Sequence, residues 1–220
     1  MRTIDAAAQT PERVAEDAAN IIQGGGTVIF PTDTVYGIGA DPQRSDAIAR
    51  IYDAKRRPHA KPLALHFATV MELLEYLDGN TLATIAARAF LPGPLTIIVR
   101  RPAFISQAVT AGMDTLGLRV PDHALCSLIL ERSGPLAATS ANPSGAPAYV
   151  GNGRERETLP EADLFIDAGP TPMERESTVI DLSGPQPRLI REGSLPLERL
   201  RAVLGPIEHP FTAPAAKDHC

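Results

Sequence analysis

Four cations fall within seven positions of one short segment: Lys55, Arg56, Arg57 and Lys61. Two prolines, Pro58 and Pro62, restrict the backbone of this segment. Arginine offers phosphate oxygens a planar fork of donors, and lysine offers a point charge. A stiff cationic loop of this kind suits a polyphosphate ligand. A solvated surface turn is the competing interpretation.

A second segment, 139–145, reads Thr-Ser-Ala-Asn-Pro-Ser-Gly and follows an apolar stretch that is typical of a buried strand. Hydroxyl groups and backbone N–H groups placed directly after a strand can bind an anion. The same residue types are also ordinary turn formers, so the segment alone does not decide between a binding site and a turn.

A third segment, 30–39, combines Pro31, hydroxyl side chains and an aromatic residue with two glycines that permit close backbone approach. His66 and Arg119 lie at or beside the ends of expected strands. Taken singly, residues at such positions are more often a core histidine with its hydrogen bonds satisfied and a surface arginine.

Helical and extended patterns alternate along the chain without strict repetition. Helices are expected at residues 11–23, 46–55, 70–77, 81–90, 122–132 and 196–203, from apolar spacing and from caps such as Thr10 with Pro11. Strands are expected at 27–30, 63–67, 95–99, 116–120, 136–139, 164–167, 178–181 and 187–190. This order predicts an α/β (or α+β) domain with a mixed sheet.

The 220 residues, 44% of them hydrophobic, are enough for one substantial core. We expect one domain over 10–205 and a flexible tail over 206–220. No apolar run approaches the roughly 20 residues of a membrane span, and the first residues do not resemble a signal peptide, so we expect a cytoplasmic protein without a membrane partner. Cys126 lies in an apolar run and is expected to be a buried structural thiol.

Several common catalytic signatures are missing from the chain. It contains no P-loop, no Rossmann glycine spacing, no nucleophile elbow and no His-Glu-x-x-His zinc helix. Phosphate binding would therefore need a different arrangement, and no metal-ligating residues are expected from the sequence.

The segments are more specific as a group, in their order along the chain, than any of them is alone. They are Phe30–Gly37, Lys55-x-Arg57-Pro58, Lys61-Pro62-Leu63, Pro92–Thr96, Val109–Pro121, Thr139–Asn142, Glu176–Asp181 and Arg191-Glu192-Gly193. In this order they resemble the YrdC-like threonylcarbamoyl-AMP synthase family over roughly residues 10–205. The resemblance implies a short, single-domain member whose twisted, open, mixed sheet is flanked by helices and surrounds a large, positively lined cavity.

The resemblance also implies a reaction. Such a nucleotidyltransferase combines L-threonine, bicarbonate (or CO₂) and ATP, with Mg²⁺, into threonylcarbamoyl-AMP and pyrophosphate, without a covalent enzyme intermediate. Partner transferases then move the threonylcarbamoyl group to an adenosine of tRNA, and a weak contact with tRNA or other RNA is conceivable.

Residue roles follow by matching motifs. The resemblance places L-threonine among Thr32, His66, Arg119, Thr139 and Ser177. It places ATP among Lys55, Arg57, Lys61, Thr115, Ser140, Ala141 and Arg191. Catalysis is assigned to Lys55, Arg57, Ser140 and Asn142.

Two other functions remain open at this point. A binding module could hold double-stranded RNA or tRNA in the same cavity, although a net charge of −5 counts against it. A carbamoyl-adenylate-forming relative of the hydrogenase-maturation type would carry Cys-x-x-Cys pairs, which this sequence lacks. Whether residues 146–158 form a mobile lid is also undecided by the sequence.

Overall fold

The computed structural model describes residues 1–58, 60–153 and 156–208. The expectations made for His59, for residues 154–155 and for most of the tail, 209–220, lie outside the described residues.

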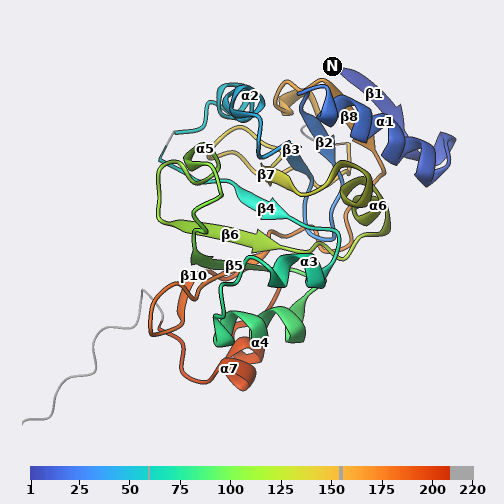
Figure 1. Cartoon of the computed structure of the whole chain (residues 1–220). Helices are drawn as coiled ribbons and strands as arrows, with labels where there is room; N and C mark the ends of the chain where they lie inside the picture. Colours follow the sequence, from blue (N-terminus) through green and yellow to red (C-terminus); the bar gives the residue numbers. More distant parts are fainter. Residues whose placement is uncertain (59, 154–155, 209–220) are drawn as a thin grey trace, which may run out of the picture.

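Ten strands form one sheet in the described part of the chain. They are β1 (Arg2–Asp5), β2 (Val28–Phe30), β3 (Gly37–Ala40), β4 (Ala64–His66), β5 (Leu95–Arg100), β6 (Thr115–Arg119), β7 (Leu136–Ser140), β8 (Leu164–Asp167), β9 (Thr178–Asp181) and β10 (Arg188–Arg191). Their order across the sheet is β1-β8-β2-β3-β7-β4-β6-β5-β9-β10. Figure 1 shows the sheet twisting from β1 at one edge to β10 at the other.

Parallel and antiparallel pairs both occur, so the mixed sheet predicted from the sequence is confirmed. β4 runs parallel to β6, for example, whereas β4 and β3 are both antiparallel to β7. The strands are short and most of their hydrophobic residues are buried on both sides, as expected for a sheet between two helical layers.

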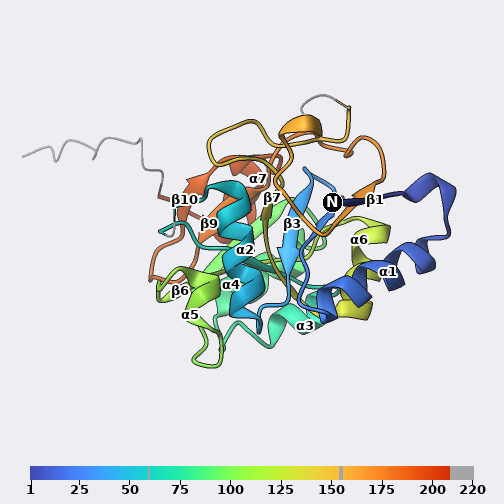
Figure 2. The ribbon, with the colours of Figure 1, turned by 90° about the horizontal axis from the view of Figure 1, so that it is seen from above.

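Helices cover the two faces of this sheet. They are α1 (Pro11–Gln23), α2 (Ser45–Lys55), α3 (Val70–Leu74), α4 (Thr81–Phe90), α5 (Gln107–Thr110), α6 (Ala124–Ser133) and α7 (Leu197–Leu204), with 3₁₀ turns at Ala6–Ala8 and Arg156–Thr158. α1 packs beside α6 over β2 and β8, and the other helices contribute to a second, larger hydrophobic cluster (Figure 2). Among the described residues, no helix has both the length and the apolar character needed to cross a membrane.

Local chemistry explains why α1 begins and ends where it was predicted. The hydroxyl of Thr10 accepts a hydrogen bond from the backbone N–H of Arg13, and Pro11 occupies the first turn. Gly24 follows the last helical residue. The apolar face carries Val14, Ala18 and Ile22, all buried against α6 and the sheet.

β3 was not among the strands expected from the sequence. It pairs with β2 on one side and β7 on the other, and all four of its residues are buried. A Cβ atom at Gly39 would stand 3.0 Å from the ring of Phe30, so the missing side chains make room for that ring. Here glycine serves close packing within a sheet rather than a turn.

The packed region is wider than the domain expected from the sequence. β1 pairs in parallel with β8, and Ile207 is buried while Glu208 forms an isolated bridge with Arg188. Cys126 is buried as predicted, and burial raises the pKa of its thiol, which keeps it protonated.

Candidate active site

A cavity of about 200 Å³ lies on one face of the central strands. In the register of the sheet, Ala64 of β4 stands opposite Ala138 of β7 and Gly117 of β6, and His66 stands opposite Arg119. Residues two apart on a strand share a face, so His66 and Arg119 point to the same side as this row of small residues. The small side chains form a floor, and the large polar ones form walls.

The cavity has two ends because β4 and β7 run in opposite directions. His66 is opposite Leu136, and Ser140 lies four residues further along β7. At the rise of a β-strand this separates the two levels by about 13 Å. We call them the His66 end, with Arg119, Thr96 and Ser177, and the Ser140 end, with Arg57 and Gly37.

Arg119 is held rigidly at the His66 end. Its Nη2 donates to Asp33 Oδ1 at 2.5 Å, and its Nε donates to the carbonyl of Gly93 at 3.3 Å. Both members of the ion pair are almost fully buried, with 6% and 2% of their side chains exposed. Burial lowers the pKa of Arg119, which Asp33 opposes. At the same end, the hydroxyls of Thr96 and Ser177 are 2.9 Å apart.

His66 is a neutral imidazole at this end. Burial is the main cause that lowers its pKa to about 3, and the nearby charge of Arg119 acts in the same direction. Its Nδ1 is buried and lacks a hydrogen-bond partner among the described residues. His66 therefore lines the cavity as an uncharged ring.

This neutral state predicts a pH-dependent stability. Between pH 3 and the unfolded value of about 6.5 the unfolded chain binds a proton at His66 that the folded chain does not, so stability is complete above 6.5 and falls below it. His66→Gln has no imidazole and should therefore lack this pH dependence of stability. Urea unfolding of both proteins between pH 6.5 and 5 should show that the free energy of unfolding of the wild type falls more than that of His66→Gln. The difference between the two slopes should approach about 1.4 kcal/mol per pH unit. Parallel pH profiles would contradict the prediction.

Lys55 lies outside the cavity wall and holds the backbone at the Ser140 end. Its ammonium donates to the carbonyls of Ser140 and Asn142, and its Nζ lies 3.4 Å from Asn142 Oδ1. The hydroxyl of Ser140 donates to the same Oδ1 at 2.5 Å, and Asn142 Nδ2 donates to the carbonyl of Ala146 at 2.6 Å. Burial first, and then Arg57, lower the pKa of Lys55 to about 7. The 140–142 turn is thus tied to the end of α2.

Arg57 lies on the cavity wall in a folded-back conformation. Its Nε donates to the carbonyl of Lys61 at 3.0 Å, and its Nη2 donates to the carbonyl of Pro62 at 2.8 Å. The cationic loop therefore holds its own arginine in place. The side chain of Lys61 is exposed, outside the cavity wall.

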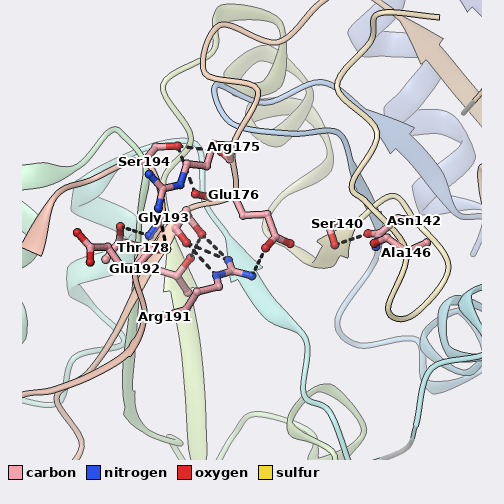
Figure 3. Close-up of polar contacts among 12 residues, drawn as sticks. Ser140, Asn142, Ala146, Arg175, Glu176, Thr178, Arg191, Glu192, Gly193 and Ser194 are labelled. Atoms are coloured by element: carbon pink, nitrogen blue, oxygen red, sulfur yellow. Dashed lines mark hydrogen bonds and ion pairs between the residues drawn. The ribbon is translucent and has the colours of Figure 1, made fainter. Parts of the chain in front are cut away.

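Arg191 and Glu176 complete the wall. Arg191 Nη1 and Glu176 Oε2 are 2.7 Å apart, and Arg191 also donates from Nε and Nη2 to the carbonyl of Ser177 at 3.1 and 3.0 Å. Figure 3 shows the carboxylate of Glu176 directed at this guanidinium, with the Ser140 and Asn142 side chains on the other side of the view.

Comparisons with known proteins identify the family of this chain. The sequence model of the Sua5/YciO/YrdC family, described as "Telomere recombination", matches residues 20–193. The chain belongs to this family. It is 40% identical over 198 residues to a threonylcarbamoyl-AMP synthase of Pyrococcus abyssi, covering 88% of this chain and 58% of that protein. A threonylcarbamoyl-AMP synthase of Bacillus subtilis is 40% identical over 195 residues, covering 86% of this chain and 56% of that protein.

The fold is also that of a solved family member. The crystal structure of P. abyssi Sua5 complexed with L-threonine superimposes with a TM-score of 0.83 at 36% identity, over 94% of this chain and 62% of that one. The chain spans a little over half the length of the two curated relatives named above. The family and the fold predicted from the sequence are confirmed.

Most of the family-motif residues come together in space. Those that line the cavity are Thr32, Arg57, His66, Arg119, Thr139, Ser140, Ser177 and Arg191. Those that lie off its wall are Lys55, Lys61, Thr115, Ala141 and Asn142. Thr32 uses its hydroxyl within its own loop, where it donates to the carbonyl of Val35 at 2.6 Å. Lys55 and Asn142 contact Ser140, which does line the cavity, and so hold it in position.

Sequence reasoning missed three polar residues of the Sua5/YciO/YrdC site. Glu176 and Thr96 line the cavity, and Asp33 lies behind Arg119. Each belongs to a motif segment that the sequence singled out, but none was given a role. A usable signal existed for Asp33 alone, because an arginine that is buried needs a counter-ion and the motif segment 30–37 contains this carboxylate.

The segment 146–158 is anchored at its start. The carbonyl of Tyr149 accepts from the backbone N–H of Tyr36 at 2.9 Å, and its buried ring lies 5.0 Å from the ring of Tyr36. The backbone N–H of Thr171 donates to the carbonyl of Val150 at 2.8 Å. These contacts hold residues 149–150 over the cavity residue Tyr36; residues 154–155 lie outside the description.

Proposed function

We propose that this protein is a threonylcarbamoyl-AMP synthase, a nucleotidyltransferase that uses L-threonine, bicarbonate (or CO₂) and ATP. One observation carries the proposal: eight residues assigned to these substrates by family motifs line one cavity. His66, Arg119 and Ser177 of the threonine set lie at the His66 end, and Arg57 and Ser140 of the ATP set lie at the Ser140 end. The two sets meet where Arg191 of the ATP set donates to the carbonyl of Ser177, and Thr139 of the threonine set directly precedes Ser140.

The size of the cavity suits the smaller of the two main substrates. Pockets for drug-sized ligands enclose roughly 300–1,000 Å³, whereas this one encloses about 200 Å³. An amino acid fits such a space, and a nucleotide would extend beyond the Ser140 end. Asp33 and Gly93 engage Nη2 and Nε of Arg119, so a threonine carboxylate would approach from the Nη1 side. Hydroxyls of Thr96 and Ser177, with the neutral His66, would orient the rest of the amino acid.

The chemistry then needs charge stabilisation rather than a nucleophilic residue. The threonine nitrogen attacks CO₂ to give a carbamate. An oxygen of this carbamate attacks the α-phosphorus of ATP as the bond to the β-phosphate oxygen breaks and pyrophosphate leaves. Negative charge that gathers on the phosphate oxygens would be met by Arg57 and Arg191, held in place by backbone carbonyls. Lys55 would act by fixing the Ser140–Asn142 turn.

Mg²⁺ suits this site as a companion of ATP. Mg²⁺ in nucleotide sites takes oxygen ligands from phosphates and from one or two protein groups. Ser140 and Glu176 offer such oxygens on the wall. Among the described residues there is no cluster of three or more His, Cys, Asp or Glu side chains that would bind a metal independently. The ion would supply additional charge neutralisation at the phosphates.

The product is a mixed anhydride, which is prone to hydrolysis. We therefore propose that tRNA threonylcarbamoyl-transferase proteins consume it in the cytoplasm, where it would support formation of N6-threonylcarbamoyladenosine. Direct contact with tRNA is not needed for the adenylation step.

Pyrophosphate release from ATP by the purified protein tests the function. We expect release only when both L-threonine and bicarbonate are present, together with threonylcarbamoyl-AMP detected by mass spectrometry. Release with carbamoyl phosphate in place of threonine would indicate a carbamoyl-adenylate former. No release in any combination, combined with salt-sensitive RNA binding, would replace the proposal with an RNA-binding function.

A further inference from the structure

Each of two cavity arginines is paired with a carboxylate, but the two pairs differ in burial. Arg119 and Asp33 expose 6% and 2% of their side chains, whereas Arg191 and Glu176 expose 42% and 39%. Separating a buried pair leaves uncompensated charge in a low dielectric, while separating an exposed pair costs little because water replaces the partner. The first pair is therefore permanent and the second can open.

Arg191 keeps its place without Glu176. Three contacts join its Nε and Nη2 to Ser177: two to the carbonyl, at 3.1 and 3.0 Å, and one to the hydroxyl at 3.4 Å. Nη1 is the nitrogen that faces Glu176. If the carboxylate leaves, the guanidinium remains aimed at the cavity with Nη1 ready for another anion.

The backbone of Glu176, by contrast, cannot follow its side chain. Its carbonyl accepts from the backbone N–H of Ser194 at 2.9 Å, and the chain packs so tightly there that a Cβ atom at Gly193 would stand 2.2 Å from that carbonyl oxygen (Figure 3). Movement is thus confined to the side chain of Glu176. Its carboxylate can leave Arg191 while the backbone stays in place.

We propose that Glu176 is an exchangeable counter-ion, which occupies the anion site of Arg191 in the empty cavity and leaves it when a phosphate chain binds. The inference rests on the proposed function only for the identity of that anion, the phosphate chain of ATP. Glu176 thereby sets the affinity for the nucleotide: each binding event must first break the Arg191–Glu176 pair, and the pair re-forms after release.

Inorganic triphosphate, without Mg²⁺, is a probe that needs neither catalysis nor recognition of the base. By isothermal titration calorimetry at physiological salt, Glu176→Gln should bind it about three to five times more tightly than the wild type, because a neutral amide competes less well for Arg191. Glu174→Gln is the matched control. It removes the same charge from an exposed neighbour, and screening should keep its effect below about twofold.

A crystal structure of the triphosphate complex gives the second readout. We expect a phosphate oxygen on Arg191 Nη1 and the Glu176 carboxylate more than about 4 Å away, beyond ion-pair distance. The inference would be overturned if Glu176→Gln bound triphosphate more weakly than the wild type, or if Glu174→Gln bound it as tightly as Glu176→Gln. It would also be overturned if the Arg191–Glu176 pair stayed intact in the complex, or if the wild type did not bind triphosphate. None of these outcomes depends on whether the pyrophosphate assay succeeds.

Discussion

Replacing Arg119 with methionine should lower the free energy of unfolding by about 3–5 kcal/mol, the largest stability effect that we expect from a single cavity residue. Methionine has a similar length but no charge, so it leaves the carboxylate of Asp33 buried without its counter-ion. One oxygen of that carboxylate, Oδ2, already lacks a partner among the described residues, so Asp33 has no visible substitute for the lost contact. Urea unfolding at pH 7 measures the change.

A surface ion pair provides the control for this effect. Arg50 contacts Asp163 at 2.7 Å, but both side chains are substantially exposed. Arg50→Met should therefore cost less than about 1 kcal/mol. Adding Asp33→Asn to Arg119→Met should restore part of the stability, because the stranded charge is then removed. If Arg119→Met cost no more than Arg50→Met, the buried pair would not have the importance assigned to it.

Arg119→Lys separates the stabilising role of this residue from its proposed role in binding threonine. Lysine keeps the positive charge beside Asp33 but lacks the planar fork. We expect a smaller loss of stability than with methionine, together with a KM for threonine raised at least about tenfold. The KM for ATP should change much less, since Arg119 lies at the His66 end of the cavity. An equal rise in both KM values would argue against this placement of threonine.

Lys55→Met is expected to have the largest effect on activity. The substitution leaves the carbonyls of Ser140 and Asn142 without their buried donor, which should cost about 2–3 kcal/mol in unfolding free energy. The turn also carries the wall residue Ser140. Small displacements of positioning groups can reduce rates by about 100-fold, so pyrophosphate release should fall at least that much. Stopped assays with saturating ATP, threonine and bicarbonate would measure it.

Arg56 is the matched control for Lys55. It is the neighbouring cation of the same loop, and its side chain is exposed. Arg56→Met should change the unfolding free energy by no more than about 0.5 kcal/mol. Comparable losses of activity in both variants would mean that the general charge of the loop matters, and that the contacts of Lys55 with the 140–142 turn do not.

Local patterns in the sequence were sufficient to predict most of the helices and strands. Caps and apolar spacing placed α1, α2, α4 and α6 within a residue or two, and β-branched runs placed most strands. β3 was missed because glycine carries no strand signal of its own, and its place in the sheet depends on the ring of Phe30 packing against it. β1 was missed because a short, mostly exposed edge strand lacks a buried periodic pattern.

The sequence by itself determined the family, the mixed α/β architecture and the set of motif residues that gather around one cavity, because these depend on local composition and on motif order. The tertiary structure alone decided which charges meet. Asp33 and Arg119 are 86 residues apart in the chain, and Lys55 and Ser140 are 85 apart. Whether a lysine faces a phosphate site or braces the turn behind it depends on burial and on the acceptors within about 3 Å, and only the folded chain brings those together.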